Sequence, residues 1–178
     1  MVEMVIRRGG PADVEPSLAV WRAAEQARRS APASSGHGGR VRGHLENPAA
    51  FHFVAEDGSG VVGMAAGMQG LADDGAGAPV VNLCHVGAVF VAPEHWGEGL
   101  GGRLVDAVLL EARSRGYNHA QLWAHADNGR AQGLYERRGF ARSGREKNDD
   151  AGETIVHYEV RLRAARETGG NPIARRRG

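Results

Sequence analysis

Four glycines occupy a short turn between an apolar run and a helical pattern, and this turn constrains the fold more than any other segment. The apolar run extends over 86–91, the turn reads Gly97-Glu98-Gly99-Leu100-Gly101-Gly102, and apolar residues at helical spacing follow over 104–109. Glycine lets backbone N–H groups approach a ligand closely. The first turn of a helix adds unpaired N–H donors and a partial positive charge. The segment therefore predicts a strand–turn–helix unit that binds a phosphate or pyrophosphate.

Two familiar phosphate loops fit this turn poorly. Gly97-x-Gly99-x-x-Gly102 matches the dinucleotide spacing, but residues 93–96 separate it from the strand, and no acidic residue stands about 20 residues further on. A P-loop is excluded because no Gly-Lys-Ser/Thr follows the glycines. A dinucleotide oxidoreductase stays open through the glycine match alone, and it predicts binding of NAD(P).

The pattern along the chain predicts an α/β fold with a largely antiparallel sheet. We expect strands at 2–7, 51–56, 61–67, 80–91, 121–125, 140–145 and 154–162, and helices from about 14, at 41–46, at 100–115 and at 129–138. Residues 30–40 are rich in Gly, Ser and Pro and predict a loop. We expect one domain over 1–162 and a disordered basic tail over 163–178.

Two motifs resemble one known family. Residues 91–101 read V-A-P-E-H-W-G-E-G-L-G and are similar to the V-x-P-x-x-(Q/R)-G-x-G-x-(G/A) pyrophosphate loop of the GNAT N-acetyltransferases. Residues 128–140 resemble the family's N-x-x-A-x-x-L-Y-x-x-x-G-F block. The resemblance covers roughly 4–162 and implies the GNAT acyl-CoA N-acyltransferase fold. In that fold a mostly antiparallel mixed sheet is flanked by helices, and strands 4 and 5 splay apart around the pantetheine arm of CoA.

The resemblance also implies which residues bind the cofactor. These are Val89, Phe90, Val91, Trp96, Gly97, Glu98, Gly99, Leu100, Gly101, Gly102, Asn128 and Tyr135. Asn128 is expected to cap the following helix as well. Trp96 departs from the family, since a guanidinium there would add a charge-assisted bond to phosphate, whereas an indole offers one N–H. We therefore expect backbone N–H groups to hold more of the pyrophosphate, and acetyl-CoA to bind more weakly.

Acetyl transfer to an amine needs a base, a donor to the carbonyl oxygen and a proton for the leaving thiolate. His85 is the candidate base, because several family members keep a Glu at this position. Strict alternation would place His85 on the same face as Gly87, Val89 and Val91, and an unperturbed imidazole has a pKa of about 6.5. Tyr135 matches the family's general acid. A backbone N–H near Val91, where the family's strand commonly bulges, is the expected oxyanion donor.

Each of these roles has an alternative. His85 can be a hydrogen-bonded core residue or a lining of the acceptor pocket, and Tyr135 can be a packed core aromatic. His125 and a water chain are the other candidates for the base. Cys84, the single cysteine, points away from His85 on an alternating strand and predicts core packing. No set of histidines and acids shows metal-ligand spacing, so we expect no metal.

The composition limits the kinds of partner and the location that we expect for this protein. A net charge of +1 gives no reason to expect nucleic acid or a membrane as partner. No apolar run reaches membrane length and no leader pattern is visible, which predicts a cytoplasmic protein. Arg greatly outnumbers Lys, and with abundant Ala and Gly this usage is typical of a high-GC bacterial genome. A homodimer is expected from family habit alone.

The leading hypothesis is an acetyl-CoA-dependent N-acetyltransferase that uses direct transfer to a primary amine, since no nucleophile is placed for a covalent intermediate. The alternative is a non-catalytic acyl-CoA-binding sensor on the same fold. The acceptor stays open among antibiotic, polyamine, amino acid and peptide amines, with a small molecule favoured. Residues 30–50 and 70–80 would shape its pocket.

Overall fold

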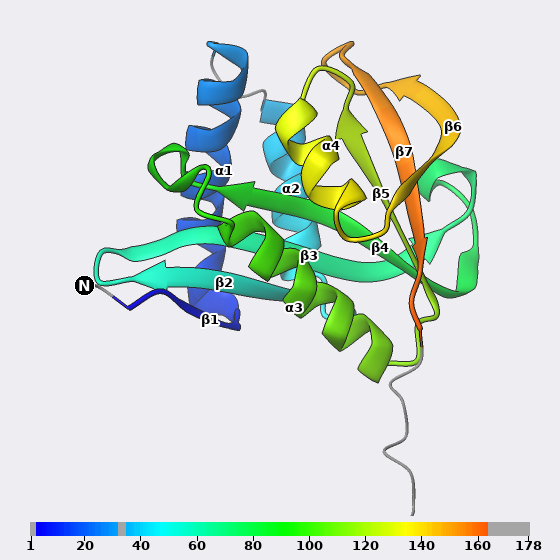
Figure 1. Cartoon of the computed structure of the whole chain (residues 1–178), viewed down its shortest axis with the longest axis horizontal. Coiled ribbons are helices and arrows are strands. Elements are labelled where there is room, and N and C mark those ends of the chain that lie inside the picture. The colour runs from blue at the N-terminus through cyan, green and yellow to red at the C-terminus, as the bar shows by residue number, and fades with distance from the viewer. Residues whose placement is uncertain (1–2, 32–34, 164–178) are drawn as a thin grey trace, which may run out of the picture.

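The computed structural model describes residues 3–31 and 35–163, which form one seven-stranded sheet with helices on both faces (Figure 1). The strand order is β1-β2-β3-β4-β5-β7-β6, and every neighbouring pair is antiparallel except β4 and β5. The strands are β1 Val5–Arg8, β2 Phe51–Asp57, β3 Gly60–Leu71, β4 Pro79–Val91, β5 His119–His125, β6 Ala141–Asn148 and β7 Thr154–Arg161. The predicted mixed, mostly antiparallel sheet is confirmed.

Two hydrophobic cores cover the two faces of this sheet. Helices α1 (Val14–Arg29) and α2 (Ser35–Glu46) pack on one face, and α3 (Leu100–Ser114) and α4 (Gly129–Glu136) pack on the other (Figure 1). The α1–α2 core includes Leu18, Trp21, Val41, Val54 and Met64. The α3–α4 core includes Leu104, Val108, Leu122, Tyr135 and Tyr158. No helix in the described ranges is both long and apolar enough to cross a membrane.

Helix α2 is the main difference from the sequence expectation. It begins at Ser35, so most of the expected loop at 30–40 is helical, whereas the expected helix began at 41. Glycine in a helix is unfavourable by about 1 kcal/mol relative to alanine, which is why composition predicts a loop. Packing overrides this preference, because a Cβ at Gly38 would lie 2.9 Å from the Trp21 ring. The expected tail falls, from residue 164 onward, outside the described residues.

Strands β4 and β5 pair over only three positions. Leu83, Cys84 and His85 lie beside His119, Ala120 and Gln121, and no further pairing of these strands follows. Beyond that point β5 continues its pairing with β7 as far as His125. The two strands therefore diverge toward their carboxyl ends, as the splayed arrangement predicts. His85 lies at the apex of the opening between them, which we call the wedge.

A β-bulge at Gly87 changes which face the side chains of β4 occupy. Val86 pairs with Gly67 of β3 and Ala88 pairs with the next β3 residue, Ala66, so Gly87 is an extra residue in β4. Cys84 and Val86 pack in the α3–α4 core before the bulge, whereas Ala88 packs in the α1–α2 core after it. Strict alternation was therefore the wrong assumption for this strand.

The bulge corrects two expectations. His85 does not share a face with Val89 and Val91: it faces α2, whereas Val91 packs in the α3–α4 core. The bulge expected near Val91 lies four residues earlier. Glycine suits the position because a Cβ at residue 87 would lie 2.6 Å from Nδ1 of His44 and 2.7 Å from Cε of Met68. Cys84 points away from His85 as expected, and burial raises the pKa of its thiol to about 12.

Candidate functional site

The glycine turn leads from the end of β4 into α3 across the mouth of the wedge. Gly97 and Gly99 have φ angles of +88° and +76°, in the left-handed region that favours glycine. A Cβ at either position would meet nothing within 4 Å, so the turn is open on its outer side. Gly102 has a different task, because a Cβ there would overlap the guanidinium of Arg138, which donates to the Gly102 carbonyl at 3.0 Å.

Six successive backbone N–H groups in this turn, those of residues 97–102, have no acceptor within the described part of the chain. The first helical bond runs from the Arg103 N–H to the Gly99 carbonyl, and Gly99 provides no side-chain cap. The partial positive charge of a 15-residue helix lies at the same place. This donor set fits a diphosphate, whose several anionic oxygens accept many N–H bonds at once.

Trp96 does not offer its N–H to a ligand. Its Nε1 donates to the carbonyl of Val91 at 2.8 Å and so fixes the turn to the end of β4. The guanidinium carbon of Arg130, from the first turn of α4, lies 4.4 Å from the centre of the Trp96 ring. Sequence reasoning missed this pair, because the two residues lie 34 positions apart and no spacing rule connects them.

The backbone of β4 beyond the bulge faces the wedge at alternate residues. The Ala92 N–H donates to the Val62 carbonyl, so Ala92 bonds toward β3. Because backbone groups alternate in direction along a strand, those of Val91 and Val89 point toward the wedge. The side chain of Val89 packs against the α3–α4 core, and that of Phe90 packs against the α1–α2 core.

Asn128 lies where β5 leads into α4. Its Oδ1 accepts the backbone N–H of Ala131 at 3.1 Å, so the expected helix cap is confirmed. Its own N–H donates to the carbonyl of His125. The cap fixes where α4 begins, and therefore where Arg130 and Tyr135 lie relative to the wedge.

Tyr135 is buried between Phe140 and Tyr158, with ring centres 5.9 Å and 6.3 Å away. Its hydroxyl has no hydrogen-bond partner among the residues described. Burial raises the pKa of this hydroxyl above its usual value near 10. Tyr135 therefore keeps its proton at neutral pH and has no protein acceptor for it, which suits a proton donor.

His85 and His44 meet at the apex of the wedge. Their ring centres lie 6.3 Å apart with the rings nearly perpendicular, and Nδ1 of each ring is buried without a partner in the described residues. Burial lowers the pKa of His85 to about 4, and the positive charges of His44, His157 and Lys147 act in the same direction. His85 is consequently neutral at neutral pH and a weaker base than the sequence suggested.

The face of β5 and β7 opposite the α3–α4 core continues from this apex. Trp123 lies 4.9 Å from the His157 ring, and the Lys147 ammonium lies 4.5 Å from the Trp123 centre. Nε2 of His157 bonds to Oε1 of Gln121 at 3.0 Å. This surface is polar and rich in imidazole, in contrast to the apolar surface beneath α3 and α4.

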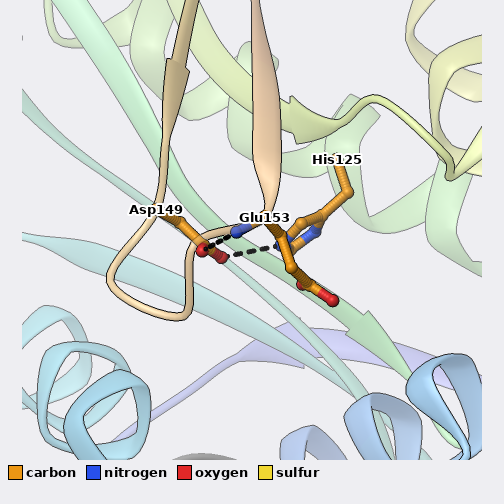
Figure 2. Close-up of side chains that lie close together, drawn as sticks. All are labelled: His125, Asp149 and Glu153. Atoms are coloured by element: carbon orange, nitrogen blue, oxygen red, sulfur yellow. Dashed lines mark hydrogen bonds and ion pairs between the residues drawn. The ribbon is translucent and has the colours of Figure 1, made fainter.

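His125, Asp149 and Glu153 converge at the open end of the wedge (Figure 2). Nε2 of His125 lies 3.1 Å from Asp149 Oδ2 and 3.2 Å from Glu153 Oε2. Spacing did not reveal this set, because β5 supplies the imidazole and the β6–β7 turn supplies the carboxylates. Nη2 of Arg28, however, lies 2.7 Å from the same Glu153 oxygen and 3.5 Å from His125 Nε2. The guanidinium already supplies the positive charge, so the cluster acts as an ionic tie between α1 and the hairpin.

Comparisons with known proteins agree with this geometry. A family model described as the acetyltransferase (GNAT) family matches residues 18–140, more than half of the chain. The mycothiol acetyltransferase of Beutenbergia cavernae is 35% identical over 77 residues, which cover 38% of this chain and 26% of that protein. The probable N-acetyltransferase family 8 member 5 of Mus musculus is 34% identical over 105 residues, 59% of this chain and 44% of that protein. The chain thus spans less than half the length of either relative.

A solved structure shows the same fold with a ligand. The crystal structure of the PaiA N-acetyltransferase from Thermoplasma acidophilum, in complex with coenzyme A, superposes with a TM-score of 0.61. The match covers 87% of this chain and 98% of that chain at 15% sequence identity. At this identity the likeness concerns the fold.

Proposed function

The chain belongs to the GNAT acetyltransferase family, and on that premise we propose that it is an acetyl-CoA-dependent N-acetyltransferase. One observation carries the proposal: the six consecutive N–H groups of residues 97–102, which have no acceptor among the described residues, lie where β4 leads into α3 at the open end of the wedge. They fit the pyrophosphate of CoA, and the wedge leads from them toward His85. In the PaiA complex a protein of the same fold binds coenzyme A.

Bound acetyl-CoA would supply an acetyl thioester whose C–S bond breaks as the acceptor nitrogen forms a bond to the carbonyl carbon. The N–H groups of the glycine turn hold the pyrophosphate in this proposal, and Asn128 fixes the start of α4 beside it. The Val91 N–H, which points into the wedge, is the proposed donor to the carbonyl oxygen. The Tyr135 hydroxyl gives its proton to the departing sulfur.

The acceptor amine must lose a proton during the transfer, and this step requires a role for His85 that differs from the one expected from the sequence. A pKa of about 4 makes His85 neutral over the working range but a weak base toward an ammonium group. We propose that the acceptor enters as the neutral amine and donates a hydrogen bond to the His85 ring. The ring then takes the proton as the amine nitrogen becomes acidic in the reaction. A water chain is the alternative. His125 is less suitable, since Asp149 and Glu153 already engage its Nε2.

The proposed acceptor is a primary amine on a small molecule, which enters from the side of α1 and α2. This side carries His44, Trp123 and Lys147, whereas the pyrophosphate turn lies at the start of α3. Direct transfer follows, because the one cysteine is buried with its pKa raised and faces the other core. We also propose a cytoplasmic bacterial protein that needs neither metal, nucleic acid nor membrane, with a homodimer as the expected assembly.

The test begins with thermal unfolding in acetyl-CoA, CoA, NADH and NADPH. A ligand at about 100 times its Kd adds about 2.7 kcal/mol to the free energy of unfolding, so we expect a clear rise in Tm with the two CoA compounds alone. Stabilisation by nicotinamide cofactors alone would instead support the dinucleotide alternative. Release of CoA thiol is then followed across a panel of amines, with little background because Cys84 is fully buried. Binding without turnover on any amine would support the acyl-CoA sensor.

A further inference from the structure

The position where the family carries Gln or Arg is occupied here by Trp96, yet a guanidinium lies beside the turn. Arg130 supplies it from α4, stacked on the indole with 4.4 Å between its central carbon and the ring centre. Trp96 is itself held by the bond from its Nε1 to the Val91 carbonyl. The indole is thus a fixed platform that connects the end of β4, the turn and the first turn of α4.

Among the described residues, no carboxylate neutralises the charge of Arg130. Arg130 has no carboxylate within ion-pair distance in the described part of the chain, whereas the guanidinium of Arg138, two residues beyond the end of α4, lies 2.8 Å from Asp106. A guanidinium stacked on an aromatic face keeps the N–H groups at its edge available for hydrogen bonds. Arg130 therefore presents hydrogen-bond donors and a full positive charge at Trp96, the residue just before the six N–H groups that have no acceptor in the described residues.

We propose that Arg130 binds an oxygen of the CoA pyrophosphate and so replaces, from α4, the side chain that the turn lacks. The inference depends on the proposed function. It also revises the expectation of weak acetyl-CoA binding, because Arg130, stacked on Trp96, supplies the cation that position 96 lacks. A pre-positioned arginine loses less rotamer freedom on binding than a mobile one, which favours affinity.

The test measures the Kd of CoA by calorimetric titration of the full chain. Loss of one charge-assisted hydrogen bond corresponds to about a tenfold rise in Kd, which we expect for Arg130→Gln, with Arg130→Lys intermediate. The matched control is Arg137→Gln, which removes another exposed arginine at the end of α4, one that makes no ion pair with any described residue, and it should leave Kd unchanged. Thermal unfolding of each unliganded variant shows that it is folded.

Two further experiments identify which phosphate of CoA Arg130 contacts. Titration with 3′-dephospho-CoA should show the same tenfold effect of Arg130→Gln if the pyrophosphate is the partner. An effect seen with CoA alone would transfer the contact to the 3′-phosphate and overturn the assignment. The double variant Trp96→Arg, Arg130→Gln returns the cation to the turn and should recover most of the affinity.

The outcomes separate this inference from the proposed function. An unchanged Kd in Arg130→Gln, with wild-type protein binding CoA, overturns the role of Arg130 and leaves the proposed function standing. Failure of the wild-type protein to bind CoA overturns the proposed function and the inference with it.

Discussion

Replacing Tyr135 by phenylalanine removes one oxygen atom that makes no hydrogen bond within the described residues. The ring contacts with Phe140 and Tyr158 remain, so packing is unchanged. A hydroxyl without a hydrogen-bond partner in the protein contributes little to stability. We therefore expect the free energy of unfolding of Tyr135→Phe to stay within about 0.5 kcal/mol of wild type, or to rise slightly.

Turnover by Tyr135→Phe, unlike its stability, should fall strongly, because loss of a general acid lowers rates by about 100-fold or more. The Kd of acetyl-CoA should change by less than about threefold, since the hydroxyl contributes to the transition state rather than to ground-state binding. The assay combines thermal unfolding, calorimetric titration of acetyl-CoA and release of CoA thiol with the best amine of the acceptor panel.

Tyr158 provides a matched control within the same aromatic cluster. Its hydroxyl donates to Glu136 at 2.9 Å and accepts from Arg142 Nε at 3.1 Å, and its side chain is fully buried. Tyr158→Phe should lose about 2 kcal/mol of stability, from two hydrogen bonds to charged groups. For a chain of this size that corresponds to a fall in Tm of roughly 4–8 °C. Normal turnover in Tyr135→Phe, or a loss of stability as large as in the control, would refute the assignment of Tyr135 as the acid.

Gly87→Ala should lower the free energy of unfolding by about 1–3 kcal/mol, because the new methyl group would press on His44 and Met68. Gly43→Ala, with open space around its Cβ, should stabilise α2. Urea unfolding compares the two variants. Stability should fall as pH drops from about 6.5 toward 4: the pKa of His85 is lower in the folded protein than in the unfolded chain, so the unfolded chain binds the extra proton. His85→Gln should reduce this slope, and an unchanged slope would assign it to other histidines. Arg28→Ala should cost about 2 kcal/mol, because it removes a largely buried guanidinium from the carboxylates of Glu25 and Glu153. Removal of Arg42, whose two ion pairs are more exposed, should change Tm little, and thermal unfolding compares the two variants.

The glycine turn and the α4 cap were predictable, because both depend on local chemistry. Positive φ at Gly97 and Gly99 and the cap at Asn128 are properties of a few adjacent residues. The strand–helix order followed from hydrophobic periodicity for the same reason. The divergence of β4 from β5 came from the family resemblance instead, since pairing between distant strands leaves no local pattern.

The contacts that define the candidate site were less predictable. The pairing of Trp96 with Arg130 and of His85 with His44 requires segments far apart in the chain to meet. The low pKa of His85 arises from burial at the apex, which composition does not reveal. Gly87 resembles many other strand glycines, and only its register against β3 identifies it as the bulge.

The extra residue at Gly87 bears on how this protein can diversify during evolution. Before the bulge, the odd-numbered residues of β4 face α2 and the even-numbered residues face the α3–α4 core. After the bulge, the even-numbered residues face the α1–α2 core and the odd-numbered residues face the α3–α4 core. Substitutions on the α2 side can therefore alter acceptor choice while the donor-binding turn stays intact. Deletion of Gly87 would remove the bulge and restore strict alternation, because Val86 and Ala88 would then be adjacent opposite Gly67 and Ala66 of β3. His85 and Cys84 would keep their present faces. We expect this lineage to accept point changes around β4 readily, and a loss of Gly87 to straighten the strand without carrying an imidazole into the apolar core.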